Sequence, residues 1–390
     1  MSACYEAPKE GEPQTEAPDI SGDGNPFRCV MTVDQDGVLR NLDALRRWTQ
    51  AQLIAVVKHN GYGLGLVPYA RLLAGHGVQC FAVSRIEEAI TLRRAGFDPD
   101  IVLMTPPQDI EQARQIVRWR LSAAVDAREQ LVWLDQQAFC ARTRCSIHLK
   151  FDTGFGRFGF AAEQARLLAD SLGRFSHLAI EGIFSHCGIL EPRQARKQFG
   201  MFLKACKLLE EAGYRPKYRH FCNSSMAMLY PSMQLDAIRV GSALLGRLPC
   251  PTPIPLERIG ALRARVLSVH DMPAGSRPGY GGAQRLKKTT PVAVVNAGWQ
   301  EGLGLERRHE IYRYRQLFSQ IKGLLTQVNR PHCAIWQDRR LPIIGRGGMN
   351  FTLLDASDCD LAAGDWVTME VNPLLVPGEV RREYIGGNPL

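Results

Sequence analysis

The sequence has no long apolar run. Its longest stretches of this kind, such as residues 53–57 and 101–104, are only a few residues long, whereas a helix that crosses a bilayer needs about 20 apolar residues. The N-terminus also lacks the basic-then-apolar pattern of a secretory signal. We therefore expect no membrane partner and no export of the chain.

The eleven cysteines lack a pattern that would bind a metal or form a disulfide framework. They are dispersed over 390 residues, their number is odd, and none forms a Cys-x-x-Cys pair with a second such pair downstream. Zinc sites need tighter spacing, and disulfide frameworks belong to short secreted chains. We expect reduced thiols, no metal, and a cytoplasmic location.

The positive charge of the chain is not gathered into a long basic run. The net charge is +9, and residues 1–26 carry six acids and one lysine, about −5, so the remainder carries about +14. The basic residues are scattered, with no aromatic-interleaved stripe. We expect a disordered acidic leader over 1–26, and a basic surface that suits small anions rather than nucleic acid.

The chain does contain a regular alternation of short apolar runs and longer amphipathic stretches. Eight runs predict strands, at 53–58, 80–85, 100–105, 121–126, 146–152, 179–185, 218–224 and 237–245. Helical patterns lie among them, at 67–75, 86–95, 109–118, 127–141, 161–172 and 191–212. Eight strands alternating with helices favour a TIM (β/α)8 barrel. The alternative is a doubly wound open sheet, but no Gly-x-Gly-x-x-Gly turn follows the first strand.

The texture changes after about Pro255. Helical pattern becomes scarce, and short runs separated by Gly, Pro and Asn follow, at 264–269, 291–296, 333–336, 342–344 and 365–371. This predicts an antiparallel β domain. We assign the barrel to 27–256, including a strand-like piece within 27–45 that leads into the first helix, and the β domain to 257–390.

Polar side chains gather where five of the predicted strands end. They are Lys58; Lys150, Asp152 and Arg157; Ser185 and His186; His220 and Ser224; and Arg239, Gly241 and Ser242. Each alone has a structural explanation, such as a solvated strand end, a satisfied core histidine or a turn. Chemistry in a TIM barrel sits at the carboxyl ends of its strands, so their conjunction at one rim indicates an active site.

The residue types at this rim suit a phosphorylated carbonyl cofactor. A desolvated lysine such as Lys58 forms a Schiff base with a carbonyl group. The backbone N–H groups near Gly241 and the hydroxyls of Ser224 and Tyr62 can hold a phosphate. Arg239 could face a ring nitrogen, and because arginine stays charged it would donate a hydrogen bond and oppose protonation of that nitrogen.

These segments resemble the motifs of a known family, the alanine racemases. Residues 57–63 resemble the lysine motif that binds pyridoxal 5'-phosphate (PLP), and residues 152–160 resemble the glycine–arginine loop. Asn223-Ser224 and 239–241 resemble the next two motifs, in the right order. Within the β domain, 279–281 resemble the segment of the second catalytic base and 345–349 the later substrate loop. The match runs from about residue 30 to 385.

The resemblance implies catalytic roles for two residues. Lys58 would bind PLP covalently and act as base on one face of the substrate. Tyr280, supplied by the partner subunit of a homodimer, would act on the other face. One base on each face moves the α-proton of a free amino acid without turning the intermediate over, and interconverts L-alanine and D-alanine, or a related small amino acid.

The resemblance also implies binding roles. The phosphate would be held by Tyr62, Ser224, Gly241 and Ser242. His186 would stack near the cofactor and link Tyr280 to Arg239, with His220 behind Arg239. Arg157 and the backbone of Met349 would hold the substrate carboxylate. Lys150 matches a lysine that is often carbamylated in the family, where the added negative charge orients the arginine.

Several positions depart from the family pattern. The segment usually written GYADGY reads Gly298 to Leu303 with Trp299 at its second place, and the usual Met-Asp pair reads Met349-Asn350. The usual phosphate-binding tyrosine has no counterpart around residues 376–379. Leu64 stands where a histidine is common, and Cys187-Gly188 where an aromatic–alanine pair is common. Trp299 and Asn350 are expected near the substrate entrance, so a racemase specialised for another amino acid is an alternative.

Two further alternatives stay open. A PLP-dependent decarboxylase of the same architecture would use a cysteine and acids of the β domain, which Cys359 within 355–360 superficially offers. Arg157, Tyr280 and Lys150 together favour racemisation. A non-enzymatic PLP-binding protein would not need the β domain that carries Tyr280.

Overall fold

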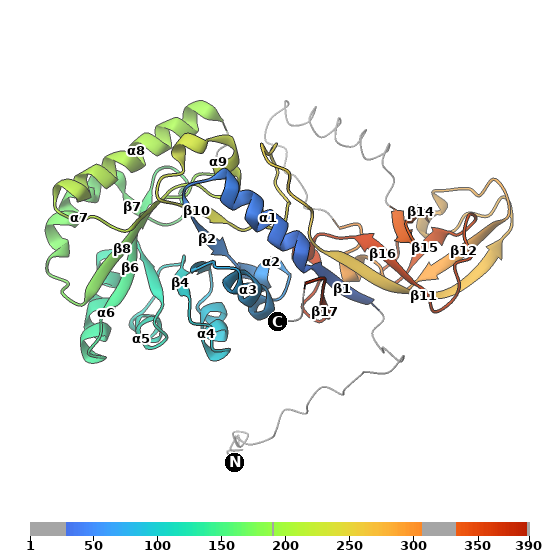
Figure 1. The fold of residues 1–390 in the computed structure, drawn as a ribbon, viewed down its shortest axis with the longest axis horizontal. Coiled ribbons are helices and arrows are strands. Elements are labelled where there is room, and N and C mark those ends of the chain that lie inside the picture. Colours follow the sequence, from blue (N-terminus) through green and yellow to red (C-terminus); the bar gives the residue numbers. More distant parts are fainter. Residues whose placement is uncertain (1–28, 189–190, 306–332, 388–390) are drawn as a thin grey trace, which may run out of the picture.

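The computed structural model describes residues 29–188, 191–305 and 333–387, which form two units lying side by side (Figure 1). The expected acidic leader over 1–26 lies outside the described residues. One unit is a ring of parallel strands surrounded by helices, and the other consists almost entirely of strands. Among the described residues, no helix is both long and apolar enough to cross a membrane.

The first unit is the expected TIM barrel. Its parallel strands are β2 (Gln52–Val56), β3 (Cys80–Val83), β4 (Asp100–Leu103), β5 (Ser122–Val125), β6 (Cys145–Asp152), β8 (Leu178–Phe184), β9 (Tyr218–His220) and β10 (Ala237–Val240). From β2 to β9 each strand pairs with the next, and β10 pairs with β2. A single parallel bridge between Asn223 and Arg239 joins β9 to β10. The barrel is therefore nearly closed.

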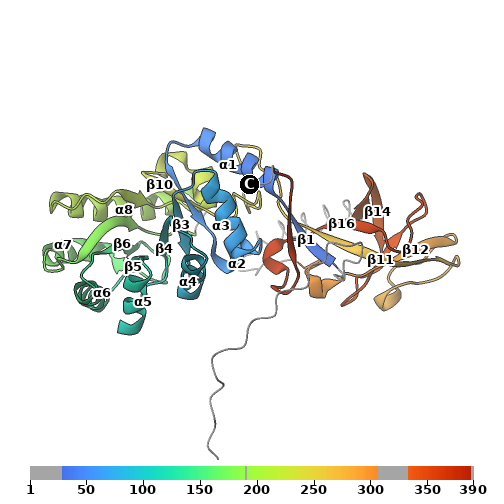
Figure 2. The same cartoon turned by 60° about the horizontal axis from the view of Figure 1, so that its bottom comes forward.

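Helices cover the outside of this barrel (Figures 1 and 2). They are α1 (Gln35–Trp48), α3 (Leu66–Gly75), α4 (Ile86–Arg94), α5 (Ile110–Arg118), α6 (Arg128–Cys140), α7 (Ala165–Leu172), α8 (Pro192–Glu211) and α9 (Ser224–Leu229). The segment labelled α2 (Lys58–Tyr62) is a left-handed turn that follows β2. A short strand, β7 (Phe160–Ala161), pairs with β6. Several observed strands end a few residues earlier than predicted, because residues such as Lys58, Ser185 and Ser224 belong to the loops and helices at the rim.

The two faces of the barrel strands differ in chemistry. On β6 the apolar side chains of Ile147, Leu149 and Phe151 belong to the large core shared with the helices. The alternate residues His148 and Lys150 are also buried, and strand geometry points them to the opposite face, into the barrel. The barrel interior is therefore polar towards its carboxyl end, which is where the site is expected.

The second unit is the expected antiparallel β domain. Its strands are β11 (Ala261–Met272), β12 (Thr290–Val295), β13 (Cys333–Trp336), β14 (Arg339–Ile344), β15 (Thr352–Asp355) and β16 (Trp366–Glu370). The first half of β11 pairs with β16 and the second half with β12. Together with the remaining pairings, this closes the six strands into a ring.

One part of the expected domain division is corrected. The strand β1 (Cys29–Asp34), which we assigned to the barrel unit, pairs with β11 and with β17 (Arg382–Ile385) in the second sheet. The physical reason is edge pairing: the pairing of β10 with β2 leaves the barrel no edge at this point, whereas β11 offers one. The described chain thus passes from β1 in the β domain into the barrel through α1.

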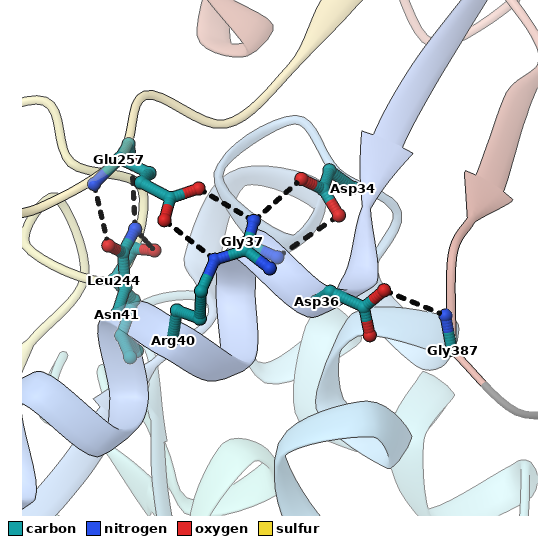
Figure 3. Close-up of polar contacts among 8 residues, drawn as sticks. All are labelled: Asp34, Asp36, Gly37, Arg40, Asn41, Leu244, Glu257 and Gly387. Carbon is teal, nitrogen blue, oxygen red and sulfur yellow. Dashed lines mark hydrogen bonds and ion pairs between the residues drawn. The ribbon is translucent and has the colours of Figure 1, made fainter.

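Polar contacts fix the junction between the units (Figure 3). Asn41 of α1 is buried; its amide donates to the carbonyls of Leu244 (3.0 Å) and Glu257 (2.8 Å) and accepts from the Glu257 N–H (2.7 Å). Arg40 makes a two-pronged contact with the Glu257 carboxylate at 2.6 and 2.8 Å. Helix α1 therefore anchors the segment that leads from the barrel into β11.

Candidate active site

Lys58 lies on a tight turn directly after β2. His59, Asn60, Gly61 and Tyr62 all have left-handed φ angles, between 52° and 64°, and such angles are costly for residues with a Cβ. The turn is held by neighbours: the Asn60 side chain accepts from the Leu66 N–H at 2.9 Å. Clusters of backbone strain of this kind are found at functional sites.

Gly63, which ends the same turn, packs closely against the backbone of Pro373. Its φ is +85°, and a Cβ at this position would lie 2.0 Å from the Pro373 carbonyl oxygen. The turn lines a cavity of about 1050 Å³ together with α4 and residues 372–376. Val376 and Gly378 also line this cavity. Residues 376–379, which lack the phosphate-binding tyrosine of the family pattern, therefore lie beside Lys58.

A cradle of hydroxyl and backbone groups lies beside this turn. The Tyr62 ring covers Gly241 so closely that a Cβ there would lie 2.6 Å from the Tyr62 hydroxyl oxygen. The Ser224 Oγ accepts from the N–H groups of Gly241 (3.1 Å) and Ala243 (3.3 Å). Ser242 lies between these two residues in sequence. The structure thus brings together the groups that the sequence assigned to a phosphate.

Arg239 is buried on β10 and surrounded by acceptors. Its Nη1 donates to the Nδ1 and the carbonyl of His220, both at 2.8 Å. Its Nη2 donates to the carbonyls of Ser185 (2.8 Å) and Phe221 (3.0 Å). Burial lowers the pKa of Arg239 to about 10, so the group is still a cation at neutral pH. It can only donate hydrogen bonds.

His186 is the neighbour of Arg239 on the side of the glycine–arginine loop. Its Nδ1 lies 3.5 Å from Arg239 Nη2, and its ring packs edge-on against Phe155 with the centroids 4.8 Å apart. Burial, followed by the charge of Arg239, lowers the pKa of His186 to about 3. The ring is therefore neutral at physiological pH.

The loop that carries Arg157 is organised by Asp152. The Asp152 Oδ1 accepts from the backbone N–H groups of Gly154 (2.9 Å), Phe155 (2.8 Å) and Gly156 (3.2 Å). The Arg157 guanidinium lies over the Phe155 ring, 4.7 Å from its centroid. One carboxylate thus shapes the turn that presents Arg157.

Lys150 is a buried cation close to this loop. Only 4% of it is exposed, and its Nζ lies over the rings of Phe158 (4.9 Å) and Phe184 (5.3 Å). In the described part of the chain, no carboxylate forms an ion pair with it. Burial, followed by the charges of Arg157 and Arg239, lowers its pKa to about 8.

Tyr280 and Met349 lie apart from these barrel residues. The strand β11, whose 12 residues span about 36–40 Å, runs through the β domain away from the barrel (Figures 1 and 2), and Tyr280 follows it in the chain. Tyr280 is 71% exposed and Met349 49%. A Cβ at Gly348 would lie 3.1 Å from Tyr280 Cε2, so the two predicted segments are neighbours on one surface.

The same surface carries the residues that depart from the family pattern. The Trp299 N–H donates to the Gly348 carbonyl at 3.1 Å, and the Gln300 N–H donates to the Met349 carbonyl at 3.1 Å. The Asn350 amide donates to the Gln300 side-chain oxygen at 2.8 Å. Trp299 is largely exposed. Residues 298–303 and 348–350 therefore form one joined surface around Tyr280.

His148 is a buried polar residue that the sequence analysis missed. Its Nδ1 lies 3.0 Å from His220 Nε2, which joins it to Arg239 through His220. The available signal was its position: His148 and Lys150 alternate with apolar residues along one predicted strand, so both face the barrel interior.

Comparison with known proteins agrees with this geometry. The sequence model of one protein family, the alanine racemase N-terminal domain, matches residues 33–249. The family model of the alanine racemase C-terminal domain matches residues 259–373. The alanine racemase of Desulfosudis oleivorans is 30% identical over 370 residues, 88% of each chain. That of Symbiobacterium thermophilum is 32% identical over 277 residues, 69% of this chain and 73% of its own.

Solved structures show the same architecture. The alanine racemase of Streptomyces lavendulae superposes with a TM-score of 0.77 at 26% identity, covering 93% of this chain and 98% of its own. A histidine racemase of Leuconostoc mesenteroides shares the fold, with a TM-score of 0.77 at 19% identity over 93% and 99% of the two chains. On the matched domains and relatives together, the chain belongs to the alanine racemase family of amino-acid racemases.

Proposed function

We propose that this protein is a PLP-dependent racemase of alanine or a related small amino acid, with two bases supplied by the two subunits of a homodimer. The observation that carries the proposal is the convergence of Lys58, Arg157, His186 and Arg239 at the carboxyl end of one barrel. We also propose a cytoplasmic location, since the ten cysteines within the described residues are all free thiols.

The barrel residues fit the cofactor. Lys58 would hold it covalently, and Tyr62, Ser224, Gly241 and Ser242 would hold its phosphate. The fit rests on the cradle between Ser224 and Gly241, where hydroxyl and N–H groups already meet. When bound, the cofactor would supply a ring that stabilises negative charge at the α-carbon. A Bartonella henselae alanine racemase of the same fold is described with covalently bound pyridoxal phosphate.

Arg239 would select the kind of chemistry. A cationic guanidinium whose two terminal nitrogens already donate four hydrogen bonds to protein acceptors cannot accept a hydrogen bond from a protonated ring nitrogen. It would therefore keep that nitrogen unprotonated and limit the electron withdrawal of the ring. Limited withdrawal favours a brief proton transfer over side reactions of a long-lived carbanion.

The two bases would lie on opposite faces of the substrate. Lys58 would move a proton at one face of the α-carbon and the Tyr280 hydroxyl at the other, which gives racemisation with no rotation of the bound molecule. Tyr280 lies in the β domain beyond β11 and is exposed, which supports its delivery to the barrel site of a second subunit. The exposed residues around it, Trp299, Met349 and Phe351, are typical of an interaction surface.

Substrate binding would depend on Arg157. Its guanidinium suits a carboxylate, with the backbone of Met349 as a second contact from the partner subunit. A carbamate on Lys150 would place a negative charge close to Arg157 and orient it. Lys150 is buried, lacks a carboxylate partner within the described residues, and has a lowered pKa, which favours the neutral amine that reacts with CO₂.

Specificity for a different amino acid is the second candidate. Trp299 and Asn350 stand where the family pattern has a tyrosine and a carboxylate, and the Asn350 amide is bound to Gln300. Loss of a negative charge at the entrance would admit side chains that a carboxylate disfavours. The decarboxylase alternative has less support, because the Cys359 thiol donates to the Ala356 carbonyl within a turn at 3.7 Å and the relatives compared above are racemases.

The test is a deuterium-exchange and chiral-product assay on PLP-loaded protein, run over a panel of amino acids in D₂O. We expect incorporation of deuterium at the α-carbon together with appearance of the opposite enantiomer, and neither with Lys58→Ala. Release of CO₂ in place of the enantiomer would overturn the proposal. The panel also decides between alanine and another substrate.

The shared site has its own test. Lys58→Ala and Tyr280→Phe should each be inactive alone. After subunit exchange, about half of the dimers are mixed and each has one intact site, so about a quarter of wild-type activity should return. Failure to recover activity in exchanged mixtures would place Tyr280 and Lys58 in the same subunit's site.

A further inference from the structure

The hydrogen bond between Arg239 and His220 fixes the position of the proton on His220. A guanidinium has donors only, so His220 Nδ1, 2.8 Å from Arg239 Nη1, must accept. A neutral imidazole that accepts at Nδ1 carries its proton at Nε2. That Nε2 lies 3.0 Å from His148 Nδ1, so His148 must in turn accept. The chain of donors runs in one direction, from Arg239 through His220 to His148.

The structure makes room for His148 with a glycine. Gly182 on β8 is paired in register with His148 on β6. A Cβ at Gly182 would lie 2.1 Å from His148 Nδ1 and 2.5 Å from its Cε1. The missing side chain therefore leaves the space that the accepting nitrogen occupies. This contact connects the identity of Gly182 directly to the hydrogen bond.

Aromatic rings hold both imidazoles in place. The His148 ring is parallel to the Tyr218 ring, with an interplanar angle of 10° and centroids 6.3 Å apart. The His220 ring stacks on Phe184, with an angle of 8° and a centroid distance of 4.8 Å. Both histidines are fully buried. Neither ring can flip without disturbing these packed neighbours.

The surroundings keep both histidines neutral. Burial, followed by the charge of Arg239, lowers the pKa of His148 to about 3. The same two causes, in the same order, lower the pKa of His220 well below its ordinary value. A proton added to either ring would replace the accepting nitrogen with a second donor and break a hydrogen bond. The neutral state of both histidines and the direction of the hydrogen bonds from Arg239 to His148 therefore depend on each other.

A polar cavity lies beside His148, at the far end of this series of hydrogen bonds. His148 lines a cavity of about 240 Å³ with Asp100, Ser122, Ser146, Glu181 and Lys217. Asp100 and Ser122 begin β4 and β5, so this is the amino-terminal end of the barrel, opposite to Lys58. A cavity of this size and polarity can hold water, which is a suitable partner for the proton on His148 Nε2.

We propose that His148 is a positioning residue for the racemase reaction. It accepts the hydrogen bond of His220 Nε2–H, keeps His220 Nδ1 as an acceptor for Arg239, and thereby holds the Arg239 guanidinium in place as a donor towards the cofactor. The proposal rests on the proposed function in one respect, that Arg239 faces the cofactor ring. His148 touches neither the substrate nor the cofactor. Its effect passes through His220, and Gly182 provides the space for it.

The test compares three variants of the PLP-loaded dimer. His148→Asn keeps an acceptor oxygen near the position of Nδ1, His148→Leu removes it, and Gly182→Ala displaces the ring without altering it. His177→Asn is the matched control, since His177 is a partly exposed histidine outside this network. Nitrogen-15 NMR of histidine-labelled enzyme reads the proton position, the visible absorption band of the lysine-bound cofactor reads the ring environment, and steady-state rates give kcat and KM.

In wild-type enzyme we expect His220 to be protonated at Nε2 only, and His148 at Nε2 only. His148→Leu and Gly182→Ala should lower kcat by about ten-fold or more, as loss of supporting hydrogen bonds does elsewhere, with KM nearly unchanged and the absorption band shifted. His148→Asn should recover most of kcat and the original band. The control should match wild type in all three measurements.

Three results would overturn the proposal. The first is an Nδ1-protonated His220 in wild type. The second is a His148→Leu variant with the wild-type band and kcat. The third is failure of His148→Asn to do better than His148→Leu when both are folded and loaded. Failure of the proposed function is seen separately, as wild-type protein that exchanges no α-proton, and in that case the NMR result still tests the hydrogen-bond chain.

Discussion

Lys150 should react with CO₂ at a pH at which ordinary lysines do not. Its pKa is lowered to about 8, first by burial and then by Arg157 and Arg239, and carbamate formation consumes the neutral amine. At pH 7.5 a pKa of about 8 leaves about a quarter of the amine neutral, compared with about a thousandth for an ordinary value near 10.4. The reactive fraction is therefore about two hundred times larger.

The assay is carbon-13 NMR of protein equilibrated with labelled bicarbonate between pH 6.5 and 9. We expect one carbamate resonance, absent in Lys150→Met, with an intensity that rises as the pH approaches 8. Removal of CO₂ should raise KM for the amino acid, because Arg157 loses the negative charge that orients it. A carbamate that forms only near pH 10, or equally in Lys150→Met, would refute the reasoning.

The same lowered pKa predicts how stability depends on pH in CO₂-free buffer. The folded pKa of Lys150, about 8, lies below the unfolded value near 10.4. Between these pH values the unfolded chain binds more protons, so this group makes the free energy of unfolding rise with pH, by up to about 3 kcal/mol in all. Lys150→Met should therefore be more stable than wild type below pH 8 and lose that advantage by pH 10.5. Urea midpoints measured for both proteins across this range would test this, and a constant difference would contradict it.

Three further substitutions test the site. Asp152→Ala removes the acceptor of three backbone N–H groups in the loop that presents Arg157. Steady-state kinetics should show KM raised by about ten-fold or more, with the affinity for PLP unchanged. Asp152→Asn keeps an acceptor oxygen and should be close to wild type. Ser224→Ala leaves the Gly241 N–H without its acceptor, and PLP titration should give a dissociation constant higher by about ten-fold. In Arg239→Lys the ammonium group cannot reach all four acceptors of the guanidinium. Loss of two charge-assisted hydrogen bonds should lower the free energy of unfolding by about 3–6 kcal/mol. An unchanged urea midpoint would argue against the network.

Much of the barrel could be predicted because its signals are local. Each strand is a short apolar run, each helix an amphipathic stretch, and the period of the pattern distinguishes the two. The residues at the strand ends, from Lys58 to Gly241, could also be predicted to meet, because parallel strands bring their carboxyl ends to one rim. That rule places Ser224 and Gly241 at the same rim, and their hydrogen bond is a contact that only the tertiary structure shows.

Other features depended on pairings between distant segments. The strand β1 has an ordinary apolar sequence, and only the availability of an edge on β11 placed it in the β domain. His148 was missed because its role depends on His220, 72 residues away, and on the absence of a side chain at Gly182. No periodicity within β6 contains that information.

The sequence by itself therefore determined the order of elements, the rim and the residue types that suit a cofactor, because these follow from local periodicity and from a general property of parallel barrels. Only the tertiary structure decided which buried groups touch and which predicted residues lie apart. It joined Arg239, His220 and His148 into one series of hydrogen bonds, and it placed Tyr280 in the β domain beyond β11 and Lys58 in the turn after β2. The physical reason is that contact distances are set by the packing of distant segments, whereas secondary structure is set largely by neighbours along the chain.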